Sequence, residues 1–284
     1  MLSRVQVSRQ EQPLTSNPIL RASLVTASAV VMVIGTLAGF GLLGTRVEES
    51  SGGALSSQAT LVAPATTAFS IWSLIYLGLI AYVVWQWWAR GNSRAARISW
   101  LAALSMLLNA AWLGVTQVGL LWLSVVVILT LAVVLGLLVQ RLGQSPPASR
   151  VEAVVVDGTF GVYLGWVSVA TVANITAVLV DAGVDPGGIW SEALAVLVLA
   201  VAALLGAVYA FRLDGRWAIA AAMTWAVGWI AAGRLGGPLY STATAVAAIA
   251  AGIAILAATA YARSRRTARP ADIAPLATTS AGRG

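Results

Sequence analysis

Long apolar runs separated by short polar stretches make up most of the chain. Eight runs are long enough to cross a bilayer, since a helix needs about 20 apolar residues to span the hydrocarbon. They lie at about 22–44, 67–88, 98–115, 119–140, 153–180, 190–211, 216–233 and 240–262. None alternates with the period of a transmembrane barrel strand, and an open strand would leave backbone groups unpaired in lipid. We therefore expect an all-α, polytopic membrane helix bundle with eight transmembrane helices.

The composition agrees with a membrane protein and excludes several kinds of chemistry. Hydrophobic residues make up 59% of the 284 residues and charged residues 10%, against roughly 25% charged in soluble domains. Cysteine and histidine are absent, and all 17 basic residues are arginine. Disulfides, thiolate or imidazole metal sites, histidine-dependent triads and catalytic lysines are thereby removed. We expect no cofactor, and an enzyme is the less favoured assignment because no acid–base pair or nucleophile stands out.

The positions of the arginines predict the topology. With the N-terminus inside, every arginine except Arg46 and Arg234 falls in a cytoplasmic segment. This positive-inside bias supports an even number of spans with both termini cytoplasmic. The net charge of +7 therefore follows from topology and does not indicate nucleic acid, although the Arg263–Arg269 cluster can attract anionic lipid. The lysine-free, alanine-rich composition is typical of a GC-rich bacterial genome, which predicts the plasma (inner) membrane.

Three segments lie outside the predicted spans and differ in composition from them. Residues 1–21 and 264–284 are polar and contain prolines, so we expect two disordered cytoplasmic tails. The connection at about 45–66 is the longest and is rich in glycine, serine and threonine. It either folds over the mouth of a pocket or stays flexible.

Polar and aromatic side chains recur at helical spacing inside three of the spans. The three sets are Phe69, Trp72 and Tyr76; Ser105, Asn109 and Trp112; and Tyr163, Trp166, Ala170 and Asn174. An amide, phenol or indole N–H in hydrocarbon is costly unless it is hydrogen-bonded. We therefore expect these faces to point inward, either toward one another as contacts between helices or toward a ligand. The spacing alone leaves both interpretations open.

The same three segments resemble the TspO/MBR family, the tryptophan-rich sensory proteins that include the translocator proteins. Residues Phe69–Tyr76 resemble its F-x-x-W-x-x-x-Y motif, and Leu108–Trp112 resemble its L-N-x-x-W motif. Residues Tyr163–Asn174 are similar to P-Y-L-x-W-V-x-F-A-x-x-L-N, with Val162 in place of the proline. The resemblance covers about residues 62–178. It implies a five-helix unit over 22–180, followed by three additional transmembrane helices over 181–263.

The resemblance also implies a function. Members of this family have an aromatic pocket for flat hydrophobic ligands such as a porphyrin, another tetrapyrrole or a sterol-like compound, used for sensing or transport. By motif, Trp72 is expected to line the pocket, Asn109 to offer a hydrogen bond, and Trp166 and Asn174 to form the opposite wall. The full expected ligand-binding set is Phe69, Trp72, Tyr76, Ser105, Asn109, Trp112, Tyr163, Trp166, Ala170 and Asn174. The expected partners are this ligand and the lipid bilayer, with a homodimer left open.

Charged residues near the membrane support an alternative function. Asp157 lies about one turn inside its span, with Arg94, Arg97 and Arg216 as candidate partners. Glu192 and Arg234 lie at the outer ends of neighbouring spans and are predicted to pair with each other. The alternative is a small-solute secondary transporter with coupling through Asp157 or Arg234. A structural subunit without a ligand is a further alternative.

A weak internal repeat relates the two parts of the chain. An offset of 117 residues places four pairs of identical residues together: Trp100 with Trp217, Met106 with Met223, Trp112 with Trp229, and Gly119 with Gly236. We hypothesise that the last three spans repeat the second to fourth spans.

Overall fold

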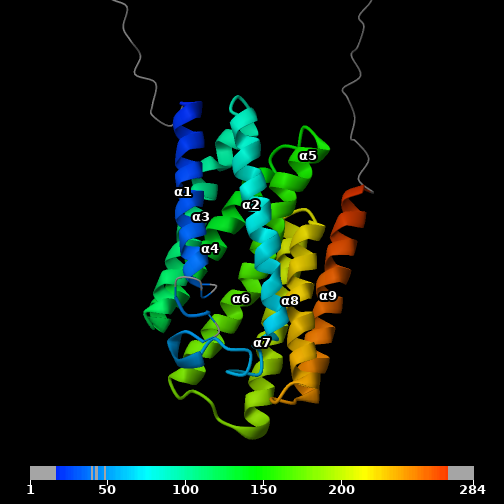
Figure 1. Ribbon diagram of the computed structural model, residues 1–284. Helices are drawn as coiled ribbons and strands as arrows, with labels where there is room; N and C mark the ends of the chain where they lie inside the picture. Colours follow the sequence, from blue (N-terminus) through cyan, green and yellow to red (C-terminus); the bar gives the residue numbers. More distant parts are fainter. Residues whose placement is uncertain (1–16, 40, 42–43, 48, 268–284) are drawn as a thin grey trace, which may run out of the picture.

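The fold is a bundle of long α-helices, seen in a computed structural model that describes residues 17–39, 41, 44–47 and 49–267 (Figure 1). Eight helical segments in this part of the chain are long and apolar enough to span a membrane, as predicted. The long helices are α1 Pro18–Gly39, α2 Ile71–Trp88, α3 Ser93–Gln117, α4 Leu121–Leu142, α6 Thr159–Asp181, α7 Gly188–Arg212, α8 Trp217–Gly236 and α9 Thr242–Thr267. Short elements are the 3-10 turns η2 Ser51–Gly53 and η3 Thr66–Ser70, the turn α5 Arg150–Glu152 and the π-helical turn η4 Ala153–Gly158.

Side-chain caps place two helix starts earlier than hydrophobicity alone indicates. Before α1, the Oδ1 of Asn17 accepts hydrogen bonds from the backbone N–H groups of Ile19 (3.0 Å) and Leu20 (3.3 Å). Before α3, the Oδ1 of Asn92 accepts from the N–H groups of Arg94 (2.7 Å) and Ala95 (3.2 Å). Such caps satisfy N–H groups that have no partner within the helix. The predicted tail segments 1–16 and 268–284 lie outside the described residues.

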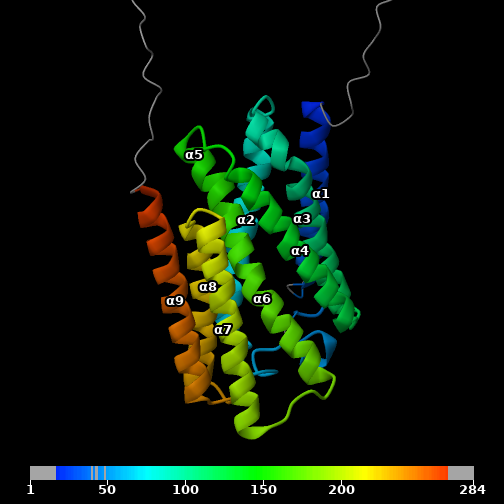
Figure 2. The same cartoon turned by 180° about the vertical axis from the view of Figure 1, so that it is seen from behind.

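The two ends of the bundle hold different segments of the chain. The start of α1, the end of α9 and α5 lie together at one end, which we call the arginine-rich end (Figures 1 and 2). The connection between α1 and α2 and the loop between α6 and α7 lie at the opposite end. This arrangement agrees with an even number of spans.

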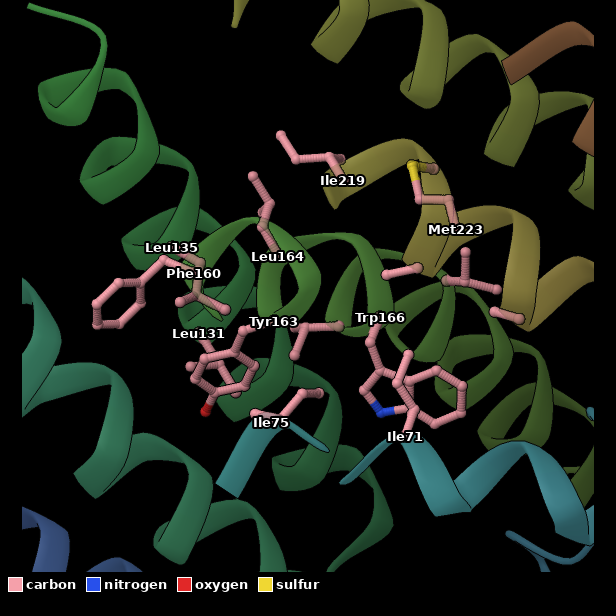
Figure 3. Packing of buried hydrophobic residues seen from close by; sticks show 14 of the residues in the cluster. Ile71, Ile75, Leu131, Leu135, Phe160, Tyr163, Leu164, Trp166, Ile219 and Met223 are labelled. Carbon is pink, nitrogen blue, oxygen red and sulfur yellow. The ribbon is translucent and has the colours of Figure 1, made fainter. Parts of the chain in front are cut away.

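The core of the bundle forms where α2, α6 and α8 meet. Figure 3 shows Ile71 and Ile75 of α2 near Tyr163 and Trp166 of α6, with Ile219 and Met223 of α8 on the other side of α6. Helix α6 is central, because it packs against α2, α4 and α8. Large apolar side chains on the outer faces are exposed, as expected for surfaces that meet lipid.

Two glycine pairs, Gly35 with Gly39 on α1 and Gly161 with Gly165 on α6, allow close helix contacts within the chain. A Cβ added at Gly165 of α6 would lie 2.4 Å from the carbonyl oxygen of Ile219 on α8, and one at Gly161 would lie 2.7 Å from the Cβ of Ala218. A Cβ added at Gly35 of α1 would lie 3.1 Å from the Cβ of Ala110 on α3. These glycines therefore serve packing inside the chain.

The packing repeats between the first four long helices and the last four. Helix α1 packs against α3 and α3 against α4; in the same way α6 packs against α8 and α8 against α9. Equivalent residues of α3 and α8 also match in exposure: Trp100 is 45% exposed and Trp217 46%, and Met106 and Met223 are both fully buried. Helix α7 differs from its counterpart α2, since α7 packs along α9. The hypothesis of a repeat thus agrees best with the pair α3 and α8.

Candidate functional site

A pocket lies at the end of the bundle opposite the arginine-rich end. It has a volume of about 550 Å³ counted to its mouth. One wall is a single face of α6, and the others come from α3, α8, η3 and the connection between α1 and α2. The lining of the α6 wall consists of Trp166, Val169, Ala170, Ala173, Asn174 and Ala177.

The connection between α1 and α2 covers this pocket. We call its described residues 44–47 and 49–65 the roof. Seven residues of the roof line the pocket: Val47, Ala54, Leu55, Ser56, Thr60, Ala63 and Pro64. Of the two expectations for this segment, folding over a pocket mouth is therefore confirmed.

Hydrogen bonds hold the roof to α3 at one side. The amide of Gln117 pairs with the backbone of Thr45, accepting from its N–H (3.0 Å) and donating to its carbonyl (2.7 Å). The hydroxyl of Ser51 donates to the carbonyl of Thr116 (2.8 Å). Both contacts use the last turn of α3, where backbone carbonyls lack partners within the helix.

Helix α8 holds the roof at the other side, chiefly through Arg234. Its Nη1 donates to the carbonyl of Thr60 and its Nη2 to the carbonyl of Ser57, both at 3.0 Å. The side chain is buried, since only 2% of Arg234 is exposed. Closer to η3, the N–H of Ala65 donates to the carbonyl of Trp229 (3.1 Å). The extra helices therefore contribute directly to the pocket.

The predicted pairing of Glu192 with Arg234 is wrong. Arg234 forms no ion pair within the part of the chain that the structure describes, because its guanidinium faces the roof carbonyls. Glu192 accepts instead from the hydroxyl of Ser241 (2.6 Å), the residue that precedes α9. The same hydroxyl accepts from the N–H of Thr244 and so caps α9.

Five of the ten predicted site residues line the pocket: Phe69, Trp112, Trp166, Ala170 and Asn174. The ring of Phe69 meets that of Trp166 edge to face, with centroids 5.7 Å apart. The indole N–H groups of Trp112 and Trp166 are buried and have no hydrogen-bond partner among the described residues. Two unpaired donors at one pocket are unusual, because buried polar groups are nearly always hydrogen-bonded.

The other five residues form a packed layer beneath the pocket. Trp72 stacks on Tyr76 with ring centroids 5.3 Å apart and meets Trp166 edge to face at 6.1 Å. The Nδ2 of Asn109 donates to the Oη of Tyr76 (3.2 Å).

The hydroxyl of Tyr163 belongs to the same layer and donates to the carbonyl of Ser105 (3.2 Å). Apart from the stacking of Trp72 on Tyr76 within α2, the contacts of this layer are between helices. A contact between any of its residues and a ligand stays a prediction.

The structure changes one detail of the predicted faces and adds lining residues. Phe69 lies in η3, before α2 begins, so only Trp72 and Tyr76 share a face of that helix. Val169, Ala173 and Ala177 were not predicted, although they continue the helical spacing of Trp166, Ala170 and Asn174 on α6.

A group of charges occupies the arginine-rich end, away from the pocket. The Oδ1 of Asp157 accepts hydrogen bonds from Arg94 (2.7 Å) and from Arg216, and Arg94 also pairs with Glu152 (2.9 Å). Two of the three predicted partners of Asp157 are therefore confirmed. The third, Arg97, donates to the hydroxyl of Ser145 instead.

The fold and the pocket define a helical membrane protein with a roofed, tryptophan-lined pocket. A family profile described as TSPO-like protein matches residues 22–261, which include all or most of each long helix. The chain belongs to this family, and the resemblance noted over about residues 62–178 extends to the last three helices. Searches of curated proteins and of solved structures found no match. Among the described residues, no group of three or more acidic residues could hold a metal ion.

Proposed function

We propose that this TSPO-like protein binds a flat hydrophobic aromatic ligand, such as a porphyrin or another tetrapyrrole or a sterol-like compound, in the roofed pocket. The observation that supports this most strongly is that the indoles of Trp112 and Trp166 both line the pocket, while their N–H groups have no hydrogen-bond partner among the described residues. A ligand with acceptor atoms pairs with these donors and removes the cost of their burial. Binding then serves sensing or transport of the ligand.

The chemistry of the pocket lining fits such a ligand. Phe69, Trp112 and Trp166 offer aromatic faces and edges to an extended ring system. Alanines at 170, 173, 177 and 226 leave the remaining wall smooth and apolar.

The protein is proposed to act in the plasma (inner) membrane, with both termini cytoplasmic. The supporting observation is that the chain has arginines at the end where α1 starts and α9 ends, which the positive-inside rule assigns to the cytoplasm. The roof and pocket then face the outer side of the membrane.

The test is a binding titration with protoporphyrin IX on the purified full-length protein. Protein is added to the porphyrin and the porphyrin absorbance is followed, so that removing a tryptophan does not change the signal itself. Saturable binding is expected for the wild type. Trp112→Phe and Trp166→Phe each remove one N–H donor and should weaken binding by about tenfold.

Trp100→Phe is the matched control, because Trp100 lies on α3 but is 45% exposed on the outer face. It should bind as the wild type does. Binding that fails to saturate, or that responds equally to all three substitutions, would contradict the proposed pocket.

A further inference from the structure

A second, larger cavity adjoins the roof on the outer side of α6. This groove has a volume of about 950 Å³ and lies between α6 and α7. Its walls are apolar, with Leu179 and Val180 from α6 and Leu194 and Val198 from α7. Its rim is polar and includes Gln58, Asp185 and Ser191. An apolar slot with a polar rim at the end of a membrane bundle fits an amphipathic ligand that lies at the surface of the bilayer.

A short segment of the roof lies between this groove and the pocket. Residues Gln58–Val62 line the groove, and Thr60 of this segment lines both cavities. The segment contains no helix or strand. A partition of this kind can move without breaking a helical hydrogen-bond ladder, so its displacement costs less than moving a helix.

Arg234 fastens this partition. Its two hydrogen bonds reach the carbonyl of Ser57, the residue just before the segment, and the carbonyl of Thr60, in the middle of the segment. The guanidinium fork matches two acceptors at once, which an ammonium group cannot do in the same way. The Nε of Arg234 is buried without a partner among the described residues, so the side chain is committed to the roof alone.

A different groove offers a competing route to the pocket. It is separated from the pocket more firmly than the groove between α6 and α7. It lies between α2 and α8, has a volume of about 620 Å³, and is lined by Leu74 and Trp225 among others. The indole N–H of Trp225 donates to the carbonyl of Ala68 (3.0 Å), and the Phe69–Trp166 ring contact lies on the pocket side of η3. Helical backbone and paired rings therefore separate this groove from the pocket.

We propose that the ligand reaches the pocket from the outer leaflet through the groove between α6 and α7, across the segment Gln58–Val62 that Arg234 fastens. This proposal rests on the proposed function, since it concerns access to the same pocket. Helices α6 and α7 make few contacts with each other, which leaves the groove open to lipid. The groove therefore serves as a vestibule, and Arg234 is a positioning residue for the partition.

The chain contains no cysteine, so a single introduced thiol can be labelled without background. Leu194→Cys places a thiol in the vestibule, and Leu74→Cys places one in the competing groove; both leucines are exposed. Each variant is labelled with a bulky maleimide in lipid nanodiscs. The rate constant for uptake of protoporphyrin IX is then measured by stopped-flow absorbance, before and after labelling.

Labelling of Leu194→Cys should slow uptake several-fold while the final amount bound stays the same. Labelling of Leu74→Cys should leave the rate unchanged. An unchanged rate after labelling Leu194→Cys, or slowing only at Leu74→Cys, would overturn the vestibule. If neither the wild type nor the unlabelled variants bind porphyrin saturably, the proposed function itself is contradicted. This result can be told apart from a change in the rate of uptake.

Substitution of Arg234 tests the partition separately. Arg234→Gln removes the charged fork and should raise the rate constants for both binding and release by about tenfold, with Arg234→Lys intermediate. A rise in release alone would indicate a weakened binding wall and would contradict the role as a fastener. The labelled Leu194→Cys protein decides the route if Arg234→Gln does not fold.

Discussion

Two arginines from different halves of the chain share one carboxylate. Asp157, on the π-helical turn before α6, accepts from Arg94 at the start of α3 and from Arg216 just before α8. Since α3 and α8 are the helices that correspond in the repeat, this contact ties equivalent ends of the two halves together. Arg94 is buried and keeps a second carboxylate, Glu152, so its charge is balanced without Asp157. Partly buried charges of this kind stabilise a fold only as a complete set.

Asp157→Asn should therefore destabilise the protein without affecting the pocket. Removing the shared charge leaves Arg216 without an acidic partner, and we expect a loss of about 3 kcal/mol in unfolding free energy. The measurement is thermal or denaturant unfolding in detergent, together with porphyrin affinity, which should not change because Asp157 lies at the opposite end from the roof. Loss of ion-coupled solute uptake by the reconstituted variant would favour the transporter alternative instead.

Asp214→Asn is the control for this substitution. Asp214 pairs with Arg266 at 3.1 Å, but the side chain of Arg266 is 60% exposed and that of Asp214 36%. An exposed pair contributes at most about 1 kcal/mol. If Asp214→Asn lowers the unfolding free energy as much as Asp157→Asn does, the larger stabilising effect of the shared carboxylate is contradicted.

At the scale of elements, the contact between α6 and α8 links the pocket wall to the helix that holds the roof. Gly165 is the point of closest approach, where any side chain meets the backbone of Ile219. Trp166, the next residue, lines the pocket. The spacing between these two helices therefore sets both the position of the indole and the position of the roof.

Gly165→Ala should push α6 and α8 apart. The added methyl group meets backbone and the Cβ of Ala222 (2.9 Å), neither of which can move aside as a flexible side chain would. Overpacking of this kind costs about 1–3 kcal/mol, measured as a lower unfolding midpoint, and should also weaken porphyrin binding. Gly136→Ala on α4 is the control, because a Cβ there meets nothing within 4 Å. Equal losses of stability and of porphyrin binding from the two substitutions would contradict the role of close packing at Gly165.

The existence of the helices could be predicted from the sequence, but several of their ends could not. The segment Ser93–Arg97 contains two arginines, so hydrophobicity places the start of that span near residue 98, whereas α3 begins at Ser93. The charge of Arg94 is tolerated there because Glu152 and Asp157, far along the chain, neutralise it. Helical spacing likewise predicted which face of α6 points inward.

Helical spacing predicts which residues face inward, but it does not show which of them line the pocket and which lie behind its wall. Trp72 and Trp166 lie on inward faces, yet only Trp166 lines the pocket, while Trp72 lies behind it against Tyr76. The roof contacts of Arg234 join residues 174 and 177 positions apart, and no local pattern encodes them. The signal that the sequence offers is that Arg234, like Arg46, lies on the predicted outer side against the positive-inside trend, and this signal points to an ion pair rather than to the roof.

For the whole molecule, the sidedness of the membrane can be tested with the same cysteine-free background. Val184→Cys lies in the loop between α6 and α7, and Gln144→Cys lies in the loop after α4; both residues are exposed. A membrane-impermeant maleimide should label only Val184→Cys in intact cells and should label both after permeabilisation. The reverse pattern would invert the proposed orientation.

The link between Arg234 and the roof also has a consequence for how the protein is made. The roof leaves the ribosome long before α8, since Arg234 follows Ser57 by 177 residues. During insertion the roof and the early helices must therefore wait without the contacts to Arg234, at a stage when exposed apolar surface favours misassembly. The proposed ligand pocket is therefore complete only late in biogenesis, once the seventh membrane segment has entered the bilayer and Arg234 has reached the roof.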